Sequence, residues 1–140
     1  MESDITIVVH GDPVPQHRPR FARVGKFVRT YNVKEDTTYR EKLYWEAKKQ
    51  VKKPISREVP LSVELNVFRR LTASLKNKAE DAELGLIQPT TRPDIDNYIK
   101  QVFDALNGIV WEDDGQIVRV TAAKWYSETP RLEIRVQIGA

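Results

Sequence analysis

The residues best suited to chemistry are acidic, and they lie in residues 92–114, RPDIDNYIKQVFDALNGIVWEDD. This stretch holds six carboxylates and two cationic side chains, whereas the rest of the chain holds 21 cationic and 14 acidic residues. A basic chain with its acid gathered in one place resembles an enzyme that holds a cation beside a polyanionic substrate. A solvated surface with chance clustering of charge accounts for the same distribution.

The first two carboxylates of this stretch, Asp94 and Asp96, are two residues apart at the start of an expected helix. Because the chain there should still be extended, both side chains can project to one side and share one cation. Lys100 is one helical turn beyond Asp96, and Asp104 is one turn further. A lysine in that place can stabilise the charge that develops during phosphoryl transfer, or hold the attacking water.

Two further carboxylates, Asp113 and Asp114, follow the expected helix and a short apolar stretch. A hairpin-like return of the chain would bring them back toward the helix start, so we expect three or four carboxylates to converge. Oxygen ligands without nearby cysteine or histidine select Mg²⁺, with Mn²⁺ as a substitute, and these ions complete their coordination with water and substrate phosphate. The expected substrate is therefore a phosphate ester.

Ordinary structural roles explain the same residues. Asp96 can cap the helix, Lys100 can pair with Asp96 across one turn, and 113–115 can form an acidic turn. Spacing alone leaves both interpretations open.

The length of 140 residues suits a single domain, which we assign to residues 1–140. The absence of cysteine excludes disulfides, thiolate zinc sites and a cysteine nucleophile. The longest aliphatic run, at 5–9, is too short to cross a bilayer, and we expect neither a signal peptide nor a membrane partner.

Hydrophobic periodicity predicts the elements that must position the acidic stretch. Strands are expected over 5–9, 21–24, 26–31, 61–68, 116–126 and 131–138, and helices over 35–53, 74–84 and 95–106. The second and third strands should form a basic hairpin about Gly25, with Phe21, Phe27 and Val28 packing on its other face. The last two strands should pair antiparallel through Thr129 and Pro130. This order predicts an α+β fold with a mixed, largely antiparallel sheet flanked by helices.

Three motifs, RPDIDNYIK at 92–100, FDAL at 103–106 and WEDDGQI at 111–117, together resemble the signature of the RusA-type Holliday junction resolvases. The DxDN start, the lysine four residues after the second aspartate and the W-x-DD turn agree in order and spacing. The loop PVPQHRPR at 13–20 is similar to the N-terminal loop of that family. The order of elements is similar over nearly the whole chain.

The resemblance implies a Mg²⁺-dependent, homodimeric endodeoxyribonuclease that nicks two strands of a four-way DNA junction symmetrically, in recombination and repair. It implies a RusA-like fold and a cytoplasmic protein of bacterial or phage origin. The implied catalytic residues are Asp94, Asp96, Asp114 and Lys100, of which the three aspartates bind the metal, and Asp113 has a supporting role. The implied DNA contacts are Gln16, His17, Arg18, Arg20 and Arg92. The chain lacks the dense arginine run that some members carry before the motif, having only Arg69, Arg70 and Arg92 on that side.

Two other functions stay open. One is a catalytically silent protein that binds four-way junctions, and the other is a nuclease of the same chemistry that prefers flaps, forks or RNA. Resolving a junction needs two equivalent cuts, which a two-fold dimer can make with two equivalent sites.

Overall fold

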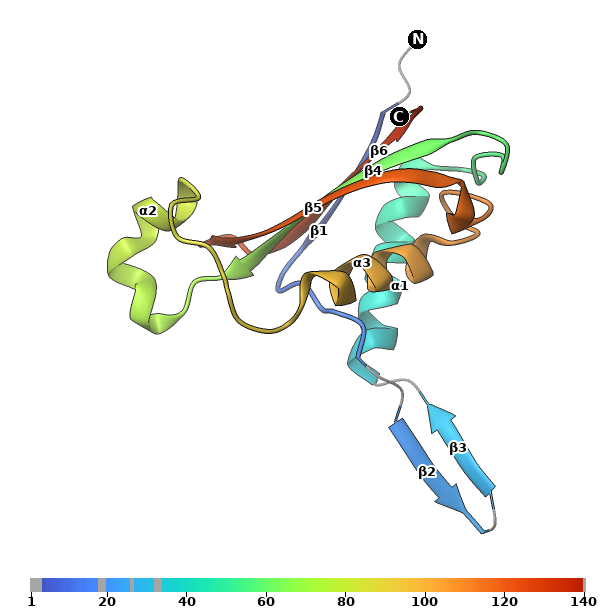
Figure 1. Ribbon diagram of the computed structural model, residues 1–140, viewed down its shortest axis with the longest axis horizontal. Helices are drawn as coiled ribbons and strands as arrows, with labels where there is room; N and C mark the ends of the chain where they lie inside the picture. Colours follow the sequence, from blue (N-terminus) through green and yellow to red (C-terminus); the bar gives the residue numbers. More distant parts are fainter. Residues whose placement is uncertain (1–3, 18–19, 26, 32–33, 140) are drawn as a thin grey trace.

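The computed structural model describes residues 4–17, 20–25, 27–31 and 34–139, and these form an α+β fold (Figure 1). Its elements follow in the order predicted from the sequence. The strands are β1 (Ile5–His10), β2 (Arg20–Val24), β3 (Phe27–Tyr31), β4 (Leu61–Arg70), β5 (Ile117–Ser127) and β6 (Arg131–Ile138). The α-helices are α1 (Lys34–Gln50), α2 (Ala79–Glu83) and α3 (Ile95–Leu106), and two 3₁₀ helices are η1 (Ala73–Lys78) and η2 (Asp114–Gln116).

The main sheet has four strands in the order β1-β6-β4-β5. β6 is antiparallel to both β1 and β4, whereas β4 and β5 are parallel, so the sheet is mixed and largely antiparallel, as predicted. Along β4, Val63, Leu65 and Val67 are buried while Glu64 is exposed. This period-two pattern turns one face of the sheet toward the core.

The predicted pairing of the last two strands is wrong, because β4 lies between β5 and β6. β4 is an internal strand with a partner on each side, and its first three residues, Leu61, Ser62 and Val63, are all buried. The three-residue connection 128–130 has no glycine to close a tight hairpin. The connection instead crosses over the C-terminal end of β4, where the Leu71 N–H donates to the Ser127 carbonyl at 3.3 Å.

The core lies between the sheet and two helices, α1 and α3, which Figure 1 shows on the same side of it. The helices contribute Tyr39, Leu43, Ala47, Tyr98, Val102 and Leu106, and the connection after α3 contributes the fully buried Trp111. Burial raises the pKa of the Tyr39 and Tyr98 hydroxyls. None of the helices in the described ranges is long and apolar enough to cross a membrane.

Two parts project from this body in Figure 1, and both were predicted from the sequence. The hairpin pairs β2 with β3 from Arg20↔Tyr31 to Val24↔Phe27, with Gly25 at a φ of 60° in its turn. The predicted distribution of its side chains between two faces lies outside the described residues. The helical stretch over η1 and α2 packs at the far end of the sheet through a small cluster around Leu71, Ala82 and Tyr126.

Truncating Leu65 to alanine should lower the free energy of unfolding by about 2–5 kcal/mol, because it opens a cavity in the central strand. Its neighbour Glu64 points to the exposed face, so Glu64→Ala should cost less than about 1 kcal/mol. Urea denaturation of both variants measures the difference. Equal losses would contradict the assignment of the two faces of β4.

Candidate functional site

The N-terminal end of α3 positions the predicted catalytic residues. The buried stripe Tyr98, Val102 and Leu106 faces the core, so Asp96 and Lys100 lie on the exposed side of the helix. Asp94 precedes the helix in an extended conformation with φ −71° and ψ 148°, after a cis peptide bond between Arg92 and Pro93. The helix ends where Asn107 and Gly108 predicted its stop.

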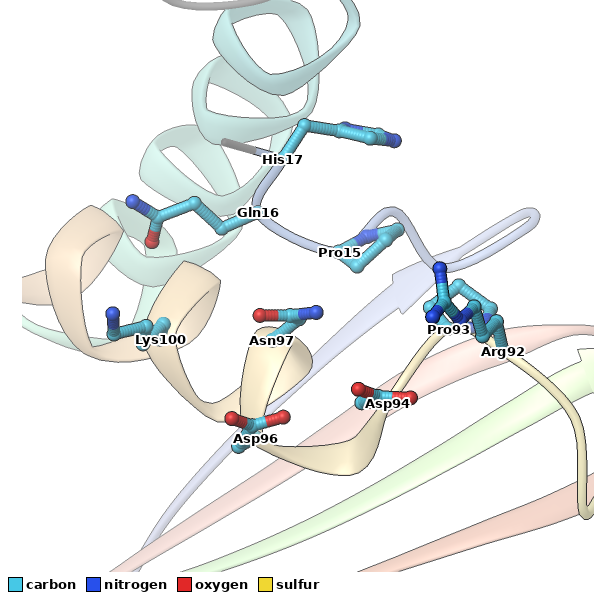
Figure 2. Close-up of a pocket in the computed structure, with 9 residues that line it drawn as sticks. All are labelled: Pro15, Gln16, His17, Arg92, Pro93, Asp94, Asp96, Asn97 and Lys100. Carbon is cyan, nitrogen blue, oxygen red and sulfur yellow. The ribbon is translucent and has the colours of Figure 1, made fainter. Parts of the chain in front are cut away.

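One pocket of about 840 Å³ gathers most of the predicted site. Figure 2 shows the N-terminal loop along one side and the start of α3 along the other. The pocket is lined by Pro15, Gln16, His17, Arg92, Pro93, Asp94, Asp96, Asn97 and Lys100. Six predicted residues, far apart in the sequence, therefore share one space. Arg18 and the side chain of Arg20 lie outside the described residues.

The two carboxylates of the pocket are not used by the fold. Asp94 is the N-cap of α3, yet its side chain accepts no capping hydrogen bond. Among the described residues, neither Asp94 nor Asp96 has a side-chain hydrogen bond or an ion pair, and Lys100 does not pair with Asp96. The capping and pairing roles that the sequence left open are therefore absent from this part of the chain, and both carboxylates are available to a ligand.

The segment that leads into Asp94 is fixed from β4 and β5. Lys124 donates to the carbonyls of Thr91 and Pro93 at 3.0 Å each, and Arg69 donates to Thr91 at 3.3 Å. Arg70 pairs instead with Asp12 at 3.1 Å. Of the three arginines expected on this side, Arg92 is the one that lines the pocket.

The N-terminal loop is tied to α3 by backbone and buried side-chain contacts. The Gln16 N–H donates to the Asn97 carbonyl at 3.0 Å. Gln101, only 1% exposed, accepts from Arg40 at 2.8 Å and places its amide nitrogen 3.5 Å from the Pro15 carbonyl. The loop is thus held against the helix that carries the carboxylates.

A second anchor joins the loop to α1, and sequence reasoning missed it. Asp36, 2% exposed, accepts from the His17 N–H at 2.7 Å with Oδ2 and lies 2.6 Å from His17 Nδ1 with Oδ1. The signal was present, since Asp36 precedes Tyr39, Leu43 and Ala47 at intervals of three and four residues. A carboxylate on the apolar stripe of a helix predicts a buried partner.

The acidic turn divides its two aspartates between different roles. Asp113 caps η2 by accepting from the Gly115 N–H at 3.2 Å, while Gln116 Oε1 accepts from the Asp113 N–H. A Cβ on Gly115 would lie 2.7 Å from the Asp113 carboxylate, so the turn suits glycine. The Asp114 carboxylate accepts no hydrogen bond from the described residues.

The expected convergence of these aspartates with Asp94 and Asp96 does not occur within one chain. The Asp114 N–H donates to the Asn107 side chain at 2.9 Å, which anchors Asp114 at the C-terminal end of α3, about 18 Å along the helix axis from Asp94. Ile55 holds the connection there through bonds to Val110 and Glu112. No three His, Cys, Asp or Glu side chains within the described ranges lie close enough together to hold a metal.

Free carboxylates beside a lysine, an arginine and a histidine suit a cation and a phosphate ester, which is the chemistry of enzymes that cleave nucleic acids. The family model described as Endodeoxyribonuclease RusA matches residues 10–137. The chain therefore belongs to the RusA family of endodeoxyribonucleases, as the motifs indicated. An uncharacterized protein of Bacillus subtilis strain 168, YqaN, is 38% identical over 137 residues, and the match covers 95% of each chain.

The two aspartates of the acidic turn should respond differently to substitution. Asp113→Ala should cost about 1 kcal/mol of stability, because it removes the cap of η2. Asp114→Asn should change stability by less than about 0.5 kcal/mol. Chemical denaturation of the two variants provides the measurement, and a larger loss for Asp114→Asn would refute this division of roles.

Proposed function

We propose that this protein is a Mg²⁺-dependent endodeoxyribonuclease that resolves four-way DNA junctions as a homodimer, by paired symmetric nicks. The pocket in Figure 2 carries the proposal, because it brings Asp94, Asp96 and Lys100 together with the N-terminal loop. Membership of an endodeoxyribonuclease family supports the reaction class.

The donor set of the pocket fits a hard divalent cation. Asp94 and Asp96 offer carboxylate oxygens that the fold does not use, and the open pocket leaves room for water and a phosphate. Mg²⁺ commonly takes one or two carboxylates and completes its coordination in that way. When bound, Mg²⁺ would supply charge neutralisation at the phosphate and a lowered pKa for water.

The cationic side chains of the pocket serve the substrate. Lys100 lies one turn beyond Asp96, where its ammonium can stabilise charge on the non-bridging phosphate oxygens in the transition state. Arg92 lines the pocket where the chain enters α3, and its fork-shaped head suits a second phosphate. Such contacts bind the DNA backbone and carry little sequence information, which suits an enzyme that selects a branched shape.

A second copy of the chain would complete the site. β5 is an edge strand with Val118 and Val120 exposed, so it can pair antiparallel with β5 of another copy about a two-fold axis. β5 runs back along α3, from the end that holds Asp114 to Lys124 beside Pro93. Antiparallel pairing would therefore carry Asp114 of each copy toward Asp94 of the other. The dimer would then hold two equivalent three-carboxylate sites.

Asp96→Asn should abolish Mg²⁺-dependent nicking of a labelled four-way junction and leave junction binding intact or tighter, because one repelling charge is gone. The matched control is Asp104→Asn on the same helix, whose carboxylate lies 3.8 Å from Arg40 and does not line the pocket. Gel-shift and cleavage assays compare the two variants. If the Asp96→Asn variant still nicks the junction, the assignment of Asp96 as a catalytic residue is wrong.

Mixing two inactive variants tests whether Asp114 acts across the dimer. A heterodimer of Asp96→Asn with Asp114→Asn would contain one intact site if Asp114 serves the other copy, so nicking of one strand should return. Mixing Asp96→Asn with Asp94→Asn is the control, because no arrangement then restores a site. If the mixture of Asp96→Asn with Asp114→Asn shows no nicking, although mass measurement verifies that heterodimers have formed, a second copy does not complete the site.

A further inference from the structure

The buried carboxylate of Asp36 has one partner residue in the described structure, His17. Burying a carboxylate costs free energy unless hydrogen bonds compensate it, and here the backbone N–H and the ring of one residue do so. His17 itself is not buried, since 43% of its side chain is exposed and it lines the pocket. The fold thus places a buried anion behind a histidine that faces the substrate space.

This contact orients the imidazole ring and favours one of its two neutral tautomers. An ionised carboxylate only accepts hydrogen bonds, so the 2.6 Å contact with Asp36 places a proton on Nδ1. The remaining nitrogen, Nε2, then gains or loses a proton as the ring exchanges it with the pocket. A buried carboxylate behind the ring orients it, as in other carboxylate–histidine pairs.

The position of His17 suits protonation of the leaving oxygen. In Figure 2 it lies on the far side of the pocket from Asp94 and Asp96. The attacking and leaving oxygens of a phosphoryl transfer stand roughly in line on opposite sides of phosphorus. If water attacks from the side of the carboxylates, the leaving oxygen departs toward the loop that carries His17.

We propose that His17 is the general acid of the cleavage reaction and that Asp36 is its positioning residue. The inference rests on the proposed nuclease function of this pocket. Water forms a new bond to phosphorus and releases its proton to solvent, while the bond from phosphorus to the bridging oxygen breaks. His17 Nε2 gives its proton to that oxygen, and the neutral ring takes a proton back from solvent.

The other charged groups around the pocket are compatible with His17 as the proton donor. Asp94 and Asp96 line the same pocket from the N-terminal end of α3, and Lys100 and Arg92 add positive charge that can bind phosphate. An imidazole exchanges protons near neutral pH, whereas lysine and arginine stay charged there. His17 is therefore the side chain of the pocket best suited to give and regain a proton in each turnover.

The test compares two junctions, one natural and one with sulfur in place of the leaving bridging oxygen. A thiolate leaves without a proton, so a general acid matters only for the natural junction. Under single-turnover conditions with Mg²⁺, His17→Gln should cut the natural junction about 100-fold more slowly and the sulfur junction at the wild-type rate. His10→Gln, at the exposed end of β1, is the matched control and should match wild type on both.

An equal loss on both junctions, or no loss on either, overturns the role of His17 as general acid. Asp96→Asn should fail on both junctions, which separates loss of the whole reaction from loss of proton donation. A wild-type protein that cuts neither junction would overturn the proposed function, and this inference with it.

The role of Asp36 has a readout that does not depend on activity. The chain has two histidines, so the ¹⁵N spectrum of histidine-labelled protein is simple, and His17→Gln assigns it. In wild type the neutral His17 ring should carry its proton on Nδ1. Asp36→Asn should shift the proton toward Nε2 and slow the natural junction as His17→Gln does. A wild-type ring protonated on Nε2 overturns the inference even if Asp36→Asn fails to fold.

Discussion

The site depends on the attachment of the N-terminal loop to the two helices of the core. Asp36 from α1 is 2% exposed and contacts His17 of the loop. Gln101 from α3 is 1% exposed and contacts the Pro15 carbonyl. Buried polar groups are costly unless they are satisfied, so the loop must stay in place for the core to be stable. The same contacts that stabilise the core therefore hold the loop opposite the carboxylates of α3.

Two of the six carboxylates that this basic chain gathers in residues 92–114 line the pocket opposite the loop. Asp94 and Asp96 stand at the exposed start of α3, without partners in the described part of the fold, and the cationic residues of the pocket surround them. One chain presents two of the three aspartates expected to bind metal, and α3 separates the third. If a second copy completes the site as proposed, cleavage would be coupled to dimerisation, so that two cuts come from one assembly.

Local sequence signals predicted much of this structure. The apolar repeat of α3, its stop at Asn107 and Gly108 and the start of the helix after Pro93 all follow from side-chain spacing and turn chemistry. The grouping of Asp94, Asp96 and Lys100 follows from the same helix. Strand neighbours could not be predicted in this way, because β4, which is remote in sequence, enters between β5 and β6, which follow each other along the chain. The place of Asp114 depends on contacts with Ile55, which is remote in sequence.

The most direct test of the account is cleavage of a four-way junction by the wild-type protein, with each strand labelled in turn, with and without Mg²⁺. The account predicts paired nicks at symmetry-related positions in opposing strands, only when Mg²⁺ is present, and little cutting of flaps, forks or RNA. Binding of the junction without nicks would contradict it and indicate a silent binding protein. Preferred cutting of flaps, forks or RNA would contradict it as well.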